Sequence, residues 1–163
     1  MNNLIKLSLK KLKIHNIPNP DLDLRILLNY SSKSKKEIFL SNFNDIDIDL
    51  HKFHIILNRR LNFEPISKII NKKNFWKYDF FVNHHVLDPR PETELIIEES
   101  LKLLTKKNKK INILDLGTGS GCLAVCLAKE FINSKITAID ISTKAMKVAS
   151  KNFNIHKCEN RIT

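Results

Sequence analysis

Three glycines within five consecutive residues are the strongest chemical feature of this chain. They are Gly117, Gly119 and Gly121, and the 163 residues contain no other glycine. Glycine costs backbone entropy on folding, but it adopts positive φ angles and lets the backbone come close to a ligand. The sequence therefore indicates a loop at residues 117–121 whose backbone contacts a small molecule.

The residues around this loop predict a strand, a helix and a second strand that together bind a nucleotide-like ligand. The apolar run 111–116 predicts a buried parallel strand, and residues 122–130 predict a helix without an internal Gly or Pro. The second predicted strand, 135–140, ends in Asp140, which follows Gly121 by 19 residues. Because a carboxylate at about this spacing accepts hydrogen bonds from ribose hydroxyls, we expect Asp140 to contact a ribose.

The spacing inside the loop separates two classes of ligand. A dinucleotide-binding loop uses Gly-x-Gly-x-x-Gly, which brings a pyrophosphate to a helix N-terminus. This chain instead has Asp-x-Gly-x-Gly-x-Gly from Asp115 to Gly121, which resembles the first motif of S-adenosylmethionine-dependent methyltransferases. No Lys follows the glycines, so a P-loop is excluded. The structural alternative is a tight strand-to-helix turn that binds no ligand.

Further segments resemble one family of these enzymes. Residues 86–95 read Val-Leu-Asp-Pro-Arg-Pro-Glu-Thr-Glu-Leu, and with 115–121 and 138–142 they resemble the HemK/PrmC family. This family comprises the protein-(glutamine-N5) methyltransferases of peptide-chain release factors. Other segments that resemble the family, in its order, are residues 23–28, 59–66 and 74–82. The resemblance covers nearly the whole chain, and the run Pro-Arg-Pro-Glu-Thr-Glu is its most specific part.

The resemblance implies a cofactor, a substrate and a set of site residues. S-adenosylmethionine would donate a methyl group to the side-chain nitrogen of the glutamine in the Gly-Gly-Gln motif of release factors. The glycines would allow close backbone approach, Thr118 and Ser120 would add polar contacts, and Asp115 would face the methionine ammonium. The cofactor residues so implied are Gly117, Thr118, Gly119, Ser120, Gly121, Asp140 and Asp115. Weaker candidates for the pocket wall are Arg90, Glu92 and Thr93, which equally suit a well-formed helix start.

The residues that would carry the chemistry are missing from these 163 residues. The family places Asn-Pro-Pro-Tyr at the end of the fourth strand, where it holds the amide nitrogen of the substrate. The only Asn-Pro here is Asn19-Pro20, in the helical region, so no catalytic residue is assigned. The chain ends on the edge of a third strand. We expect this polypeptide alone to transfer no methyl group, and a truncated reading frame, a split gene or an incomplete piece would each explain it.

The chain is expected to be an α/β protein with three parts. Residues 1–72 form a small helical bundle, which by the resemblance holds the protein substrate, and residues 73–89 form a β-hairpin linker. Residues 90–163 form the first half of a Rossmann-like S-adenosylmethionine-dependent methyltransferase domain, which is incomplete. In the bundle we expect a first helix that ends near residues 18–20, a second with Asp21 as its N-cap and a third over Lys35–Leu40. A fourth is expected to start at Asp45 or Asp47, and a short fifth to have Pro65 in its first turn. The chain departs from the family at Lys68, Asn71 and Asp88, where an aromatic, a glycine and an aliphatic residue are usual.

Composition limits the class of protein and its location. The net charge is +11, but the Lys residues are mostly dispersed, and abundant Lys, Asn and Ile suggest A/T-rich codons. We therefore do not expect specific nucleic-acid binding. There is no apolar run of roughly 18 residues and no signal peptide, which predicts a cytoplasmic protein without a membrane span. The three cysteines are expected in the core, with no metal site, and we expect a monomer.

Three other functions remain open at this point. An adenine-N6 DNA methyltransferase would share the cofactor loop and would label duplex DNA. A non-catalytic remnant would bind a release factor or a ribosomal partner through the helical region and transfer nothing. A dinucleotide-dependent oxidoreductase would bind NAD at the loop, although the glycine spacing argues against it.

Overall fold

A computed structural model describes residues 3–33 and 48–163 and divides the chain into two compact units, Met1–Ile70 and Asn71–Thr163. Each unit has its own buried apolar core. The helix expected over residues 35–40 lies outside the described residues. Across the part of the chain that is described, no helix is both long and apolar enough to span a membrane.

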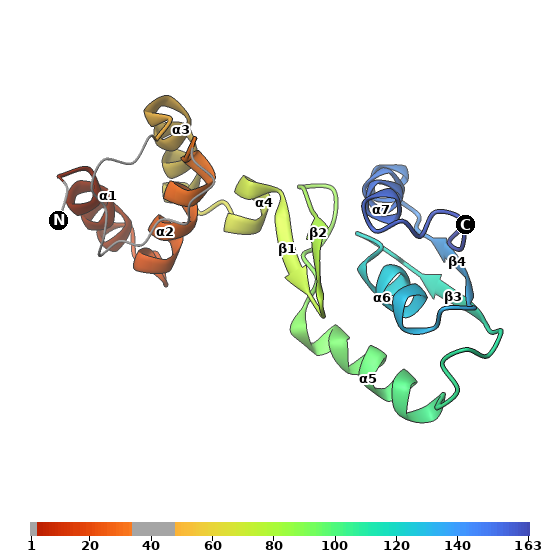
Figure 1. Ribbon diagram of the computed structural model, residues 1–163. Helices are drawn as coiled ribbons and strands as arrows, with labels where there is room; N and C mark the ends of the chain where they lie inside the picture. Colours follow the sequence, from red (N-terminus) through yellow and green to blue (C-terminus); the bar gives the residue numbers. More distant parts are fainter. Residues whose placement is uncertain (1–2, 34–47) are drawn as a thin grey trace. The chain divides into compact units, whose positions relative to one another are not determined.

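The described residues of the first unit form four helices around one core (Figure 1). The helices are α1 (Asn3–Ile14), α2 (Pro20–Ser31), α3 (Leu50–Leu61) and α4 (Ile66–Ile70). The fully buried side chains at its centre include Leu24, Leu27, Leu28 and Phe53. An ion pair of 2.6 Å between Asp23 of α2 and Arg60 of α3 joins two of the segments that resemble the family. Both side chains are largely buried, so removing one partner would leave an uncompensated charge.

Two helix starts in this unit differ from the sequence prediction. Helix α2 begins at Pro20 with Asn19 as its N-cap, so the prediction of a cap at Asp21 is wrong. Proline fits the first helical position because its fixed φ suits the helix and its missing N–H needs no partner there. Helix α3 is capped by Asp49, whose side chain accepts a 2.9 Å hydrogen bond from the Lys52 amide. The helix therefore starts after Asp45 and Asp47, which are outside the described residues.

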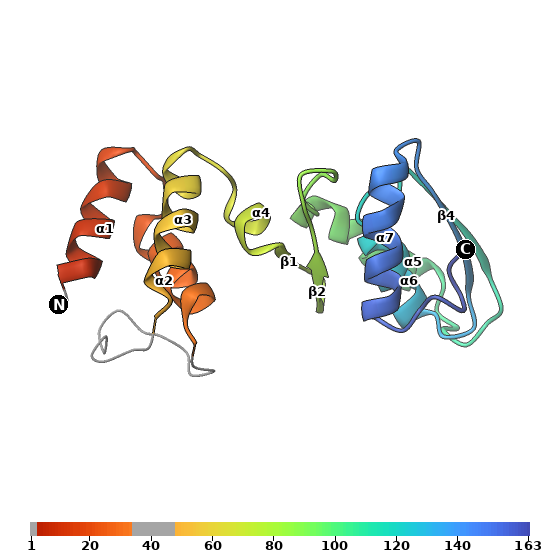
Figure 2. The same ribbon diagram turned by 90° about the horizontal axis from the view of Figure 1, so that it is seen from above.

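The second unit combines a hairpin with a parallel strand pair and its helices (Figure 2). In chain order its elements are β1 (Lys72–Phe75), β2 (Tyr78–Phe81), the 3-10 turn η2 (Pro91–Thr93), α5 (Glu94–Leu103), β3 (Asn112–Leu116), α6 (Cys122–Glu130), β4 (Lys135–Ile139) and α7 (Thr143–Ile155). Strands β3 and β4 are parallel, with Leu116 opposite Ile139. Ile162 forms a parallel bridge to Ile136 on the other edge of β4. This arrangement is an α/β fold consistent with part of a methyltransferase domain.

The parallel strand pair is buried on one face only. Ile136 and Ala138 pack into the core beside α6, whereas Leu114, Leu116 and Ile139 are 59%, 67% and 48% exposed. The expectation of a buried strand at residues 111–116 is therefore wrong for the face of β3 that carries Leu114 and Leu116. An apolar run of this kind is typical of a parallel strand that helices cover on both faces. Among the described residues, the packing on β3 and β4 is on the side of α6.

The hairpin is shorter and begins earlier than the sequence predicts, and it belongs to the second unit. Its turn consists of Trp76 and Lys77, and Trp76 has a φ of 56°. Glycine usually takes this position in a two-residue turn because a side chain there is strained. Asn71, just before β1, likewise has a φ of 53°, where the family usually has glycine. Asparagine tolerates this region better than most residues.

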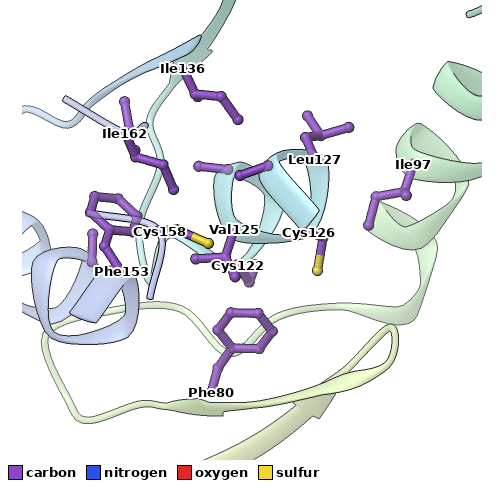
Figure 3. Close-up of a cluster of buried hydrophobic side chains, with 14 of the residues drawn as sticks. Phe80, Ile97, Cys122, Val125, Cys126, Leu127, Ile136, Phe153, Cys158 and Ile162 are labelled. Atoms are coloured by element: carbon purple, nitrogen blue, oxygen red, sulfur yellow. The ribbon is translucent and has the colours of Figure 1, made fainter. Parts of the chain in front are cut away.

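The core of the second unit surrounds α6, as Figure 3 shows. Helix α6 is buried along most of its length, and Phe80, Phe153 and Ile136 pack against it from three other elements. Cys122 and Cys126 belong to this core and are unpaired thiols, which confirms the expectation that they pack as small apolar residues. Burial raises the pKa of both thiols, so they stay protonated at neutral pH.

Candidate functional site

The glycine loop connects the carboxyl end of β3 to the start of α6. All three glycines have positive φ angles, 76° at Gly117, 57° at Gly119 and 76° at Gly121. The amides of Gly117 and Thr118 both donate to the carbonyl oxygen of Ile139, at 2.8 and 3.0 Å. The loop is therefore fixed to the end of β4, and the carboxyl ends of both strands meet at one site.

Glycine is required at these three positions for two different structural reasons. A Cβ atom added at Gly117 would meet nothing within 4 Å, and one at Gly119 would meet only the Gly117 carbonyl at 3.9 Å. A Cβ atom at Gly121 would lie 2.6 Å from the Phe153 ring and 3.2 Å from Ala149. Gly121 thus permits close packing of α7, whereas Gly117 and Gly119 expose backbone beside open space that a ligand can fill.

Asp140 lies beside this open space at the end of β4. One carboxylate oxygen accepts a 2.9 Å hydrogen bond from the Gly119 amide, and the other accepts a 2.8 Å bond from the Ser142 amide. The two bonds fix the carboxylate between the loop and the start of α7. A carboxylate oxygen has a second lone pair, so Asp140 can accept further hydrogen bonds from hydroxyl groups.

Asp115 and Thr118 are already paired with each other. The Thr118 hydroxyl donates to Asp115 Oδ2 at 2.7 Å, and both side chains are buried, at 6% and 8% exposure. The Ser120 side chain is also buried. These buried side chains therefore stabilise the conformation of the loop from its core side. A contact between Asp115 and a ligand ammonium group stays a prediction, as do ligand contacts by the two hydroxyls.

The weaker pocket candidates lie at the beginning of α5. Arg90 caps η2, its carbonyl accepts a 3.0 Å hydrogen bond from the Thr93 amide, and the Arg90 and Glu92 side chains are exposed. Over the described ranges, no hydrogen bond or ion pair connects these residues to the glycine loop. Their role as a pocket wall stays a prediction.

Two glutamates hold the strained hairpin turn, and the sequence did not single them out. Glu94 of α5 accepts a 2.7 Å hydrogen bond from the Trp76 amide. Glu130 of α6 accepts bonds from the Trp76 indole at 2.9 Å and from the Lys77 ammonium at 2.5 Å. The bond from Lys77 and the bond from Trp76 lower the pKa of Glu130 to about 2. Both glutamates therefore stabilise a turn that lacks the usual glycine.

Asn152 of α7 is a third residue whose role the sequence analysis missed. Its side chain is completely buried and bonds to Ser120 in the glycine loop and to Phe81 of β2. The available signal was helical spacing, because position 152 falls on the same apolar face as Val148 and Ala149. A buried amide on an apolar face requires hydrogen-bond partners from other elements.

The charges at the site are unfavourable for a pyrophosphate. Gly117 and Gly119 leave room for close approach, and Asp140 supplies a fixed acceptor for hydroxyl groups. Two carboxylates lie next to the loop, the buried Asp115 that is paired with Thr118 and the Asp140 carboxylate, and the loop itself contains no basic residue. Negative charge at the site would repel a pyrophosphate and attract a cation such as an ammonium or a sulfonium.

The fold is consistent with part of a methyltransferase domain, and a family model supports that class. The model for "Ribosomal protein L11 methyltransferase (PrmA)" matches residues 91–163. That range contains the glycine loop and Asp140.

Individual relatives are similar over much more of the chain. The release factor glutamine methyltransferase of Buchnera aphidicola subsp. Baizongia pistaciae is 40% identical over 98% of this chain and 58% of its own length. The enzyme of that name from Koribacter versatilis is 37% identical over 89% of this chain and 52% of its own. The bifunctional methyltransferase of Rickettsia typhi is 36% identical over 88% of this chain and 31% of its own.

These relatives confirm the family resemblance that the motifs indicated. Over most of its length the chain is similar to release factor glutamine methyltransferases, and it spans little more than half the length of the enzymes from Buchnera aphidicola subsp. Baizongia pistaciae and Koribacter versatilis.

Proposed function

We propose that the protein containing this chain methylates the side-chain amide nitrogen of the glutamine in the Gly-Gly-Gln motif of peptide-chain release factors. The observation that carries the proposal is the 40% identity, over 98% of the chain, to a release factor glutamine methyltransferase. The meeting of the glycine loop with Asp140 at the strand ends supports the same activity, because it provides a site for the methyl donor.

The donor in this proposal is S-adenosylmethionine, which supplies an electrophilic methyl group on a sulfonium. Gly117 and Gly119 let the backbone approach it, and Thr118, Ser120 and Gly121 keep the loop in shape. Asp140 accepts hydrogen bonds from the ribose hydroxyls, and Asp115 attracts the methionine ammonium. The residues Arg90, Glu92 and Thr93 contribute one wall of the pocket.

Activation of the acceptor amide requires hydrogen-bond acceptors that orient its nitrogen, and the family motif that supplies them does not occur in these 163 residues. An amide nitrogen is a poor nucleophile because its lone pair is delocalised into the carbonyl group. Acceptors that orient the nitrogen toward the methyl group would supply most of the catalysis, through positioning and electrostatic stabilisation. No Asn-Pro-Pro-Tyr occurs in the sequence. A polypeptide of these residues alone should therefore bind the donor without transferring its methyl group.

In this proposal each of the three regions of the chain has its own role. The N-terminal region, residues 1–72, holds the release factor, residues 73–89 link it to the cofactor region, and residues 90–163 hold the cofactor. The protein acts as a cytoplasmic monomer and recognises a protein, without specific nucleic-acid binding. The charge of +11 assists its approach to an acidic partner.

The test is a transfer assay with the protein purified from its native cell, whose intact mass is measured first. It is incubated with methyl-labelled S-adenosylmethionine and a release factor. If the protein is longer than 163 residues, we expect label on the release factor, lost when the Gly-Gly-Gln glutamine of that factor is replaced by alanine. If it ends at residue 163, we expect no label.

Three results would contradict the proposal. Label on duplex DNA in place of the release factor would identify an adenine-N6 DNA methyltransferase. Label retained on the alanine-substituted release factor would move the reaction to another residue. Capture of a release factor by a longer protein that transfers no methyl group would indicate a binding module without catalysis.

A further inference from the structure

The Asn152 side chain joins two segments that are remote from each other in sequence. Its Oδ1 accepts a 2.8 Å hydrogen bond from the Phe81 amide, and its Nδ2 donates to the Phe81 carbonyl at 2.9 Å. The same Nδ2 donates to the Ser120 carbonyl at 2.7 Å. Both hydrogens of the amide are thus used, and a full set of partners surrounds a side chain with no exposed surface.

The bond to Ser120 fixes one peptide plane of the glycine loop. The carbonyl of the peptide between Ser120 and Gly121 is held by Asn152, and its N–H donates to the Thr118 carbonyl at 2.8 Å. Ser120 lies between two glycines, which have the widest choice of backbone conformations. Anchoring both ends of this peptide therefore prevents it from rotating and keeps the loop in one conformation.

The two bonds to Phe81 satisfy backbone groups on the outer edge of the hairpin. Backbone groups on the outer edge of a strand need partners, and α7 supplies them here in place of another strand. His156, one turn further along α7, bonds to the Asp79 carbonyl at 3.0 Å, and the Lys151 ammonium lies 3.4 Å from the centre of the Phe81 ring. Helix α7 therefore holds β2 through several contacts, and Asn152 is the one that also reaches the loop.

We propose that Asn152 is a positioning residue that fixes the glycine loop for its ligand and couples the loop to strand β2. Ligand bound at the loop then restricts the backbone of Phe81. By linkage, the factor by which the ligand favours the restrained Phe81 backbone is also the factor by which loss of this restraint weakens ligand binding. This inference rests on the proposed function, because its ligand is S-adenosylmethionine.

The first test is amide hydrogen exchange of the unaltered chain, with and without S-adenosylmethionine. We expect the ligand to slow exchange at Gly121 and at the Phe81 amide, which donates to Asn152. The Ile136 amide, which donates to the Arg161 carbonyl, serves as the control and should change little. Slower exchange in the loop with no change at Phe81 would overturn the coupling. Absence of any binding by the folded chain would instead contradict the proposed function.

The second test replaces Asn152→Asp, which keeps the shape and the acceptor but presents a carboxylate oxygen to two carbonyl groups. Loss of the two hydrogen bonds that Nδ2 donates to the Phe81 and Ser120 carbonyls should weaken S-adenosylmethionine binding at least tenfold. It should also abolish the ligand-dependent protection at Phe81. Asn154→Asp is the matched control, since Asn154 is exposed on the same helix and undergoes the same charge change.

A folded Asn152→Asp protein that binds as tightly as the unaltered chain would refute the positioning role. If this variant does not fold, the exchange experiment on the unaltered chain decides between the two outcomes.

Discussion

At the scale of single residues, the glycine loop contains two glycines with the same backbone angle and different surroundings. Gly117 and Gly121 both have a φ of 76°, but only Gly121 is packed against neighbouring side chains. The two positions share the same left-handed φ, and they differ in the space around them.

Gly121→Ala should destabilise the chain much more than Gly117→Ala. Both changes carry the cost of a left-handed alanine, about 1–2 kcal/mol, and Gly121→Ala adds overpacking against Phe153 of roughly 1–3 kcal/mol. Urea unfolding measures both losses. S-adenosylmethionine affinity should fall strongly in the Gly117 variant, because its new methyl group occupies the open side of the loop. Equal stability losses, or unchanged affinity of the Gly117 variant, would contradict this account of the loop.

The Glu130 carboxylate predicts a specific response to acid. Its pKa is about 2 in the folded chain, against an ordinary value of 4.5, so folding favours its charged form. The stabilisation is full above about pH 5 and is lost as the pH falls toward 2. Glu130→Gln should cost about 1–3 kcal/mol at pH 7, in line with hydrogen bonds to a charged group, and the difference from the unaltered chain should shrink in acid.

The matched control for this prediction is Glu99→Gln. Glu99 pairs with Lys102 at 2.7 Å on the exposed surface of α5, and such pairs contribute little. Thermal unfolding at a series of pH values compares the two variants. A constant difference between the Glu130 variant and the unaltered chain from pH 7 to pH 2 would show that the carboxylate charge is unimportant.

At the scale of the elements, the chain forms several turns that glycine would form more easily. Five non-glycine residues of the described chain have positive φ angles: Asn16, Phe63, Asn71, Trp76 and Lys157. Each stores strain, since a side chain disfavours the left-handed region. At Trp76 the strain is offset by Glu94 and Glu130, which hold the turn from two helices. Lys157, which follows α7, is exposed, so a substitution there tests the strain argument most simply.

Lys157→Gly should stabilise the second unit by about 0.5–1 kcal/mol. Lys157 has a φ of 55° just after the end of α7, which is the position where helices most often use glycine. Relief of strain exceeds the entropy cost of glycine at such a position. Lys147→Gly, an exposed change inside the same helix, should instead destabilise by about 1 kcal/mol. Chemical denaturation tests both, and destabilisation by Lys157→Gly would contradict the strain argument.

The sequence predicted the elements whose signals are local. The glycine loop, the helix after it and Asp140 at a strand end follow from residue types at fixed spacings, and the structure contains all three. The partners of Asn152 and Glu130 were not predictable in this way, because they lie in elements remote in sequence. The burial of the first strand was overestimated since an apolar run does not tell which packing layers are present.

At the scale of the whole molecule, the described residues form two units with separate cores, and we identify one candidate ligand site among them. The site lies in the second unit, where the loop, β4 and α7 meet through backbone and carboxylate hydrogen bonds. The one-sided sheet leaves Leu114 and Leu116 exposed on its open face. Donor binding by the second unit is therefore the property that can be tested on these residues directly.

The most direct test of the central claim is calorimetric titration of the folded chain with S-adenosylmethionine and, separately, with NAD. We predict saturable binding of S-adenosylmethionine that Asp140→Ala weakens by at least tenfold, and no binding of NAD at the same concentrations. A folded chain that binds NAD, or that binds neither compound, would contradict the assignment of the glycine loop and Asp140 to a methyl-donor site.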